Sequence, residues 1–128
     1  MIYLDTSVAL AQLLAEDQRP PAALWEQPLI SSRLLEYELW KRLHARDLAG
    51  SHGEAAELLL ARISLIELSR DVLVRALDPF PVAVRTLDAL HLGSLEFLRA
   101  QGLKARLASY DTRLGMGARA MGHELEPL

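Results

Sequence analysis

The chain has 128 residues, of which 51% are apolar, and a formal net charge of −3. This length predicts one domain, residues 1–128, and the composition excludes a disordered or fibrous protein. Cysteine is absent, which excludes a disulfide scaffold, a thiolate metal site and a cysteine nucleophile. The first residues lack the basic region of a signal peptide, and no apolar run approaches the roughly 20 residues that cross a bilayer, so we expect a cytoplasmic protein without membrane contact.

Apolar runs and breaker residues predict strands that alternate with helices. In chain order, the first half is expected to contain a strand at 1–4, a helix at 8–14, a short helix at 22–26, a strand at 28–30 and a helix at 33–47. Ser31 and Ser32 can cap the start of the long helix, and Gly50 is expected to end it.

The second half continues the alternation. It is expected to contain a helix from 51 to about 63, a strand at 65–68, a short helix at 71–77, a helix from Thr86 or Asp88 to 101, a strand at 106–110, a helix from 111 to about 121 and an edge strand at 123–125. Strands separated by helices predict a mainly parallel sheet of four or five strands with helices on both faces, a three-layer α/β/α fold.

Four acidic residues are predicted to meet at one edge of this sheet. Asp5 and Asp111 directly follow strands, Glu38 lies in the second turn of the helix after the second strand, and Asp88 starts a helix that returns to the sheet. In sheets of this kind, ligands bind beyond the carboxyl ends of the strands. Two carboxylates 4 Å apart repel by about 4 kcal/mol at an effective dielectric of ~20, so four such groups either bind a cation or hold some protons.

An oxygen-only site without cysteine suits Mg²⁺ or Mn²⁺. Such an ion can activate a water and stabilise a leaving oxyanion, which points to phosphodiester hydrolysis. Each acid also has an ordinary explanation, because Asp5, Asp88 and Asp111 can cap helices and Glu38 can pair with Arg42 on the surface. The hypothesis therefore depends on the joint placement of the four acids.

Glu36 competes with Glu38 for the site. Two residues apart on a helix, their side chains differ by about 200° in direction, so only one of them can face the sheet edge. Both lie on partly apolar faces of the helix, and periodicity does not decide between them.

Four segments, MIYLDTS, SSRLLEYELWKR, RTLDALHLGS and SYDTRL, occur in this order from Met1 to about Arg119. Together they resemble the PIN-domain ribonucleases, and in particular the VapC-type toxins of bacterial toxin–antitoxin pairs. The resemblance implies the catalytic and metal-binding residues Asp5, Glu38, Asp88 and Asp111, and so selects Glu38 over Glu36. It further implies a Mg²⁺- or Mn²⁺-dependent endoribonuclease that acts on RNA, is neutralised by a cognate VapB-type antitoxin and forms a homodimer.

Supporting roles are expected for several neighbouring residues. Thr6 and Ser109 can orient the carboxylates or simply cap and pack. The arginines near the acids can hold RNA phosphates, brace the carboxylates or remain solvated surface charges; these are Arg42, Arg85 and Arg113. His91 is expected to be packed and hydrogen-bonded, with a proton-shuttle role as the alternative. The net charge of −3 lacks the basic excess of a typical nucleic-acid binder, although setting the four site acids aside leaves −3 + 4 = +1.

Two rival functions remain at this point. In aspartyl-phosphate chemistry Asp5 would be the nucleophile, but phosphatases of that type need a second Asp where Ser7 stands, and receiver domains need a Lys after a strand, whereas Lys104 precedes its strand. The other rival is a catalytically inactive PIN-like module that binds protein or RNA.

Overall fold

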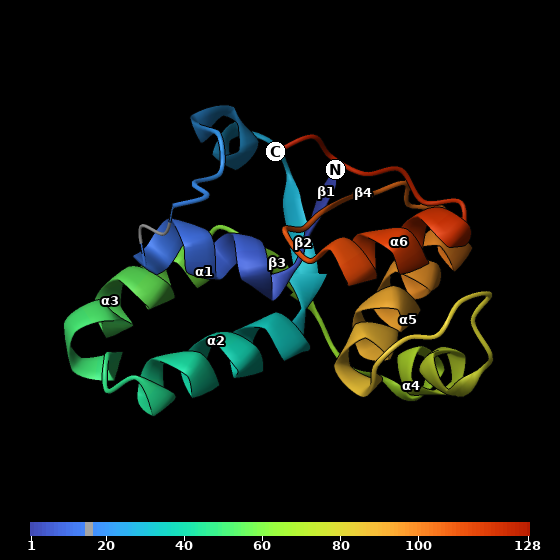
Figure 1. Ribbon diagram of the computed structural model, residues 1–128, viewed down its shortest axis with the longest axis horizontal. Helices are drawn as coiled ribbons and strands as arrows, with labels where there is room; N and C mark the ends of the chain where they lie inside the picture. Colours follow the sequence, from blue (N-terminus) through green and yellow to red (C-terminus); the bar gives the residue numbers. More distant parts are fainter. Residues whose placement is uncertain (15–16) are drawn as a thin grey trace.

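A computed structural model describes residues 1–14 and 17–128 (Figure 1). Its described part contains four strands, which are β1 (Ile2–Leu4), β2 (Leu29–Ser32), β3 (Ser64–Ile66) and β4 (Arg106–Ala108). They form one parallel sheet in the order β3-β2-β1-β4, with Ile2 opposite both Leu29 and Arg106. This confirms the predicted parallel sheet, at the lower of the two expected strand numbers.

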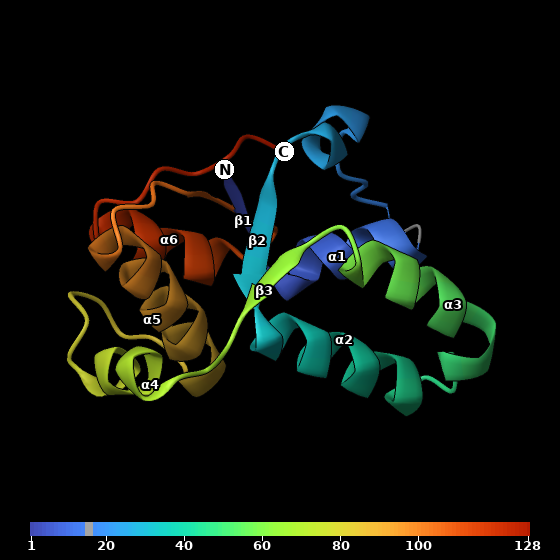
Figure 2. The same ribbon diagram turned by 180° about the vertical axis from the view of Figure 1, so that it is seen from behind.

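Helices cover both faces of the sheet, as the views from the front and from behind show (Figures 1 and 2). One side carries α1 (Thr6–Leu14), α2 (Arg33–Ala45) and α3 (Ala49–Leu60); the other carries α4 (Arg70–Leu77), α5 (Thr86–Ala100) and α6 (Thr112–Ala120). A short 3₁₀ helix, η1 (Ala22–Glu26), precedes β2. The three-layer α/β/α prediction is therefore confirmed.

The side chains of the central strand β1 contribute to two hydrophobic cores, one on each face of the sheet. Ile2 and Leu4 pack into the cluster beneath α1 and α2, whereas Tyr3 packs into the cluster beneath α5 and α6. All three side chains are fully buried. Side chains alternate between the faces of a strand, so a strand covered on both sides reads as a continuous apolar run.

The direction in which successive strands are added to the sheet reverses at β1. The chain moves outward from β1 to β2 and β3, and then returns to place β4 on the other side of β1. The crevice beyond the carboxyl ends of β1 and β4 is therefore a topological switch point, the place where open α/β sheets bind ligands.

The end of α2 corrects one prediction. Gly50 does not end this helix; it lies in the first turn of α3. The left-handed residue after α2 is instead Asp47, with a φ of 56°. Its N–H bonds to the His44 carbonyl at 3.1 Å and the Leu48 N–H bonds to the Leu43 carbonyl at 2.8 Å, the Schellman pattern that glycine usually makes.

Other boundaries shift by a few residues. α1 begins at Thr6 rather than residue 8, α4 begins at Arg70 behind a Ser69 cap, and β4 ends at Ala108 rather than Tyr110. The predicted strand at 123–125 is wrong, because only an isolated bridge between Leu107 and Leu125 forms there. Within the described stretches, no helix is both long and apolar enough to span a membrane.

Candidate active site

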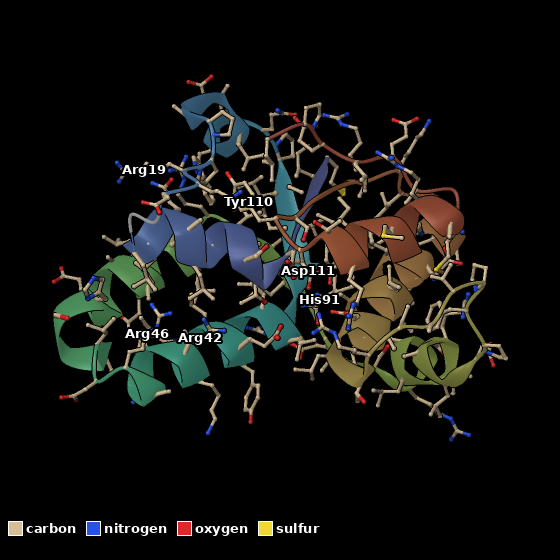
Figure 3. The ribbon with its side chains drawn as sticks, in the orientation of Figure 1. Arg19, Arg42, Arg46, His91, Tyr110 and Asp111 are labelled. Carbon is tan, nitrogen blue, oxygen red and sulfur yellow. The ribbon has the colours of Figure 1, made fainter. Side chains whose placement is uncertain are left out.

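All four predicted acids line one cleft at the carboxyl edge of the sheet. The cleft has a volume of about 610 Å³. Its lining includes the predicted acids Asp5, Glu38, Asp88 and Asp111, together with Thr6, Ser7, Leu10, Gln18, Arg42, Arg85, Thr86, Leu87, His91 and Tyr110. His91 and Asp111 come from the layer of α5 and α6, whereas Arg42 comes from α2 on the other side (Figure 3).

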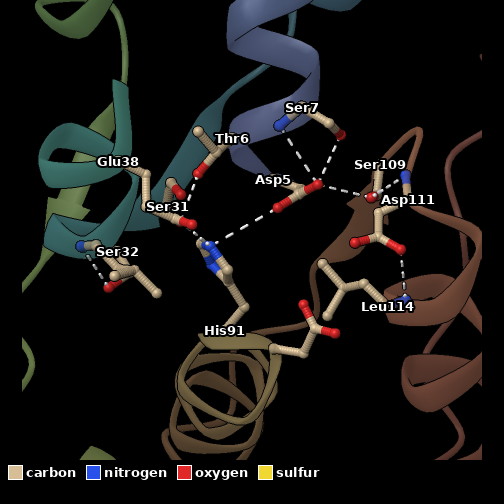
Figure 4. A network of polar contacts seen from close by, with 12 residues as sticks. Asp5, Thr6, Ser7, Ser31, Ser32, Glu38, His91, Ser109, Asp111 and Leu114 are labelled. Atoms are coloured by element: carbon tan, nitrogen blue, oxygen red, sulfur yellow. Dashed lines mark hydrogen bonds and ion pairs between the residues drawn. The ribbon is translucent and has the colours of Figure 1, made fainter. Parts of the chain in front are cut away.

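Asp5 is held rigidly where β1 passes into α1. Its Oδ2 accepts hydrogen bonds from the Ser7 hydroxyl at 2.6 Å and the Ser109 hydroxyl at 2.8 Å (Figure 4). The Ser7 hydroxyl also accepts from the N–H of Tyr110 at 3.0 Å, so the turns after β1 and β4 are tied together. Asp5 is 7% exposed, and its other oxygen remains directed towards His91.

Glu38 reaches the cleft from the second turn of α2. Its Oε1 accepts from the Thr6 hydroxyl at 2.8 Å and contacts His91 Nε2 at 2.9 Å. Burial raises the pKa of Glu38, but the hydrogen bond and charge of His91, together with Thr6 and Arg42, outweigh burial and leave this pKa below its ordinary value. Glu36 instead pairs with Arg33 at 3.2 Å, and among the described residues only Glu38 of the two lines the cleft.

His91 links the buried core to two of the acids. Its Nε2 lies 2.9 Å from Glu38 Oε1 and 3.7 Å from Asp5 Oδ1, while its Nδ1 lies 2.8 Å from the hydroxyl of Tyr3. An ionised carboxylate can only accept a hydrogen bond, so Nε2 is the protonated ring nitrogen and donates the hydrogen bond to Glu38. In the neutral imidazole, Nδ1 then accepts from the Tyr3 hydroxyl, which fixes the tautomer. The prediction of a packed, hydrogen-bonded histidine is confirmed, and its partners are site residues.

Asp88 and Asp111 share one arginine. Arg85 Nε lies 3.3 Å from Asp88 Oδ2, and its Nη2 lies 3.2 Å from Asp111 Oδ2. The other Asp111 oxygen caps α6 by accepting from the N–H groups of Arg113 at 2.9 Å and Leu114 at 3.2 Å. Burial raises the pKa of Asp88, and although Arg85 opposes this, the nearby Asp111 and Asp5 charges help to keep the pKa above its usual value.

The donor set fits a hard divalent cation. Asp5 and Glu38 are each anchored through one oxygen and keep the other for a further partner, whereas the second oxygen of Asp111 pairs with Arg85. Mg²⁺ and Mn²⁺ favour such carboxylate oxygens and retain several waters. Across residues 1–14 and 17–128, however, no three His, Asp or Glu side chains stand close enough together to hold one ion as they lie. The guanidinium of Arg85 bridges the two acids that would complete such a group.

Comparisons with known proteins decide the family. A model described as "PIN domain" matches residues 2–116. The chain belongs to the PIN domain family. This PIN domain is 30% identical over 124 residues to Ribonuclease VapC46 of Mycobacterium tuberculosis, covering 94% of this chain and 92% of that protein. It is 33% identical over 129 residues to Ribonuclease VapC35 of the same species, with the same coverage.

Solved structures give the same fold for this PIN domain. A chain described as a toxin–antitoxin complex from Klebsiella pneumoniae superposes with a TM-score of 0.69, at 17% identity and 94% coverage of both chains. At that identity the likeness shows a shared fold. The family predicted from the four sequence segments is therefore confirmed, along with its VapC-type relatives.

Sequence reasoning missed two residues of this PIN-domain site. Ser7 was considered only as the wrong residue for a phosphatase, yet it donates to Asp5 and accepts from Tyr110. Its position two residues after a strand-ending Asp is the signal that could have identified it. Tyr3 had no such local signal, because its partner His91 lies 88 residues away in the sequence.

Proposed function

We propose that this PIN domain is a divalent-metal-dependent endoribonuclease that hydrolyses RNA phosphodiester bonds. The observation that supports it is that four acids from four separate chain segments line one cleft at the switch point of the sheet. The printed names of its curated relatives, Ribonuclease VapC46 and Ribonuclease VapC35, support the same activity. Mg²⁺ or Mn²⁺ is the proposed cofactor, held by Asp5, Glu38, Asp88 and Asp111.

The side chains of the cleft have distinct tasks in this proposal. The bound ion, when present, supplies an activated water and charge stabilisation at the phosphate. Ser7 and Ser109 orient Asp5, while Thr6 and His91 orient Glu38, so that the ligand oxygens are fixed before substrate arrives. The chemistry requires no covalent nucleophile from the protein.

The aspartyl-phosphate alternative finds no support in the geometry. A receiver domain needs a lysine beside the phosphorylated Asp. Lys104 lies before β4, at the end of the sheet opposite to Asp5, and pairs there with Glu124 at 3.6 Å. Asp5 Oδ2 is already engaged by two hydroxyl groups.

Two partners belong to the proposal. The toxin–antitoxin neighbour and the VapC relatives support a cognate VapB-type antitoxin, which we propose covers the acidic cleft. A homodimer, which the family resemblance implies, stays a prediction that light scattering of the purified protein can check.

The test compares two glutamates on the same helix. Glu38→Gln should reduce Mn²⁺-dependent cleavage of a single-stranded RNA by about 10²-fold or more, because metal-held stabilisation amounts to several kcal/mol and 1.36 kcal/mol is tenfold. Glu36→Gln removes a carboxylate two residues away that pairs with Arg33 outside the cleft, and it should cleave like the wild type.

Two further results decide the mechanism. EDTA should abolish cleavage, and activity that persists in EDTA would reject the metal requirement. A wild-type protein that binds RNA but leaves it intact at millimolar Mn²⁺ would favour the inactive binding module instead.

A further inference from the structure

The acidic cleft continues as a groove between α1 and α2. Thr6 and Leu10 line it from α1, and Glu38 and Arg42 line it from α2. Gln18, which follows the C-terminal end of α1, lines it as well, so the cleft runs along the helices away from the sheet edge. A substrate that enters at the acids therefore has a wall on each side along which it can continue.

One face of α2 changes from acidic to basic along this groove. Glu38 and Arg42 are four residues apart, so they lie on one side of α2 about 6 Å from each other along its axis, and Arg46, four residues further on, caps the C-terminal end of the helix. Both arginines are exposed. Figure 3 shows them extending from α2 on the side that faces α1, with Arg46 further from His91 and Asp111 than Arg42.

This arrangement suits a polyanion that is held at one reactive phosphate and continues along the helix. The acidic end carries the proposed cation for that phosphate, and the arginine end presents fork-shaped guanidinium groups that bind phosphate oxygens in pairs. It also accounts for RNA binding by a chain with a net charge of −3, because the positive charge is local. The whole cleft has a volume of about 610 Å³, which suits a single strand rather than a duplex.

We propose that Arg42 and Arg46 bind the phosphate backbone of single-stranded RNA as it leaves the acidic cleft along α2. This inference rests on the proposed function, since it assigns a path to the substrate of the same site. It predicts that the two residues contribute to RNA affinity through charge, independently of base sequence.

The test measures binding of a fluorescent single-stranded oligoribonucleotide by anisotropy across a salt series. All proteins carry Asp5→Asn, which stops cleavage in the proposed mechanism. For single strands the slope of log affinity against log salt changes by about 0.7 for each phosphate contact. The variant Arg42→Gln/Arg46→Gln should therefore lower the magnitude of the slope by about 1.4 and weaken the Kd at low salt by about tenfold or more.

Two variants serve as controls. Lys41→Gln removes one positive charge from the same helix, at a position about 100° around the axis from Arg42, and should leave slope and Kd as in the parent protein. Arg42→Lys/Arg46→Lys keeps the charge and loses the fork, so it should retain the slope while binding more weakly than the parent.

An arginine double variant with the same slope as Lys41→Gln would overturn the inference, and so would an equal loss of slope with an RNA duplex as ligand. Cleavage by the wild-type protein is scored separately. If RNA is cleaved but the slope does not change, the path along α2 is wrong and the proposed function stands. If RNA is neither cleaved nor bound, both fail.

Discussion

Gly93 lies in the middle of α5, at the point where this helix crosses α4. A Cβ atom added there would lie 3.0 Å from the carbonyl oxygen of Val72, 3.1 Å from Ala76 Cβ and 3.2 Å from Ala76 N. Carbon atoms in good contact are about 3.5–4.0 Å apart, so Gly93→Ala must push the two helices apart by several tenths of an ångström.

The net effect sets a packing cost against a helix-propensity gain. Replacing Gly by Ala in a helix interior stabilises by about 1 kcal/mol, whereas overpacking costs about 1–3 kcal/mol. Two of the three crowded atoms belong to the backbone of α4 and cannot rotate away, so the cost is near the top of that range. We expect Gly93→Ala to lower the free energy of unfolding by about 1–2 kcal/mol, measured by urea denaturation.

Gly53→Ala provides the matched control. This glycine also lies inside a helix, α3, but an added Cβ would meet the Trp40 ring at 3.5 and 3.6 Å, which is ordinary contact. It should stabilise the protein by up to about 1 kcal/mol. A Gly93→Ala protein as stable as the wild type would show that α4 yields easily and would refute the packing argument.

Three further changes follow from individual contacts. Arg85→Gln should bind Mn²⁺ several-fold more tightly than the wild type in calorimetry, because it frees the two carboxylates that the arginine bridges, whereas Arg42→Gln should change the affinity less; equal affinities for all three proteins would contradict this. Asp47→Gly should raise the free energy of unfolding by about 0.5–1 kcal/mol. Glycine adopts the left-handed conformation without strain, and this gain exceeds the loss caused by the greater freedom of glycine in the unfolded chain. His123 is buried, and burial and Arg99 lower its pKa against the opposing effect of Glu96. The unfolded chain then binds the proton more readily, so stability falls as the pH drops below 6.5; His123→Gln should show a smaller loss of unfolding free energy between pH 7.5 and 5.5, and the exposed His44→Gln should behave like the wild type.

The sequence predicted those features that depend on local chemistry. The apolar run before Asp5 ends where β1 ends, and Gly102 and Gly122 follow their helices with φ values of 83° and 85°. Gly50 was misplaced because Asp47 takes the left-handed conformation after α2 instead, a role for which glycine is only the commonest residue.

The choice between Glu36 and Glu38 needed tertiary structure. Both lie on faces that mix polar and apolar residues, so periodicity leaves the rotation of α2 about its axis open. The full burial of Leu35 and Leu39 against the sheet sets that rotation and turns Glu38 into the cleft. The resemblance chose the same glutamate from a motif, without a physical reason.

The pairing of β1 with β4 joins the two ends of the chain. Ile2 lies opposite Arg106, and Asp5 depends on the hydroxyl of Ser109. During translation, a nascent polypeptide that has not yet extended past these later residues lacks both the edge that supports its first strand and one of its four acids. A fragment that stops before β4 should therefore not assemble the cleft, even though it contains three of the four acids.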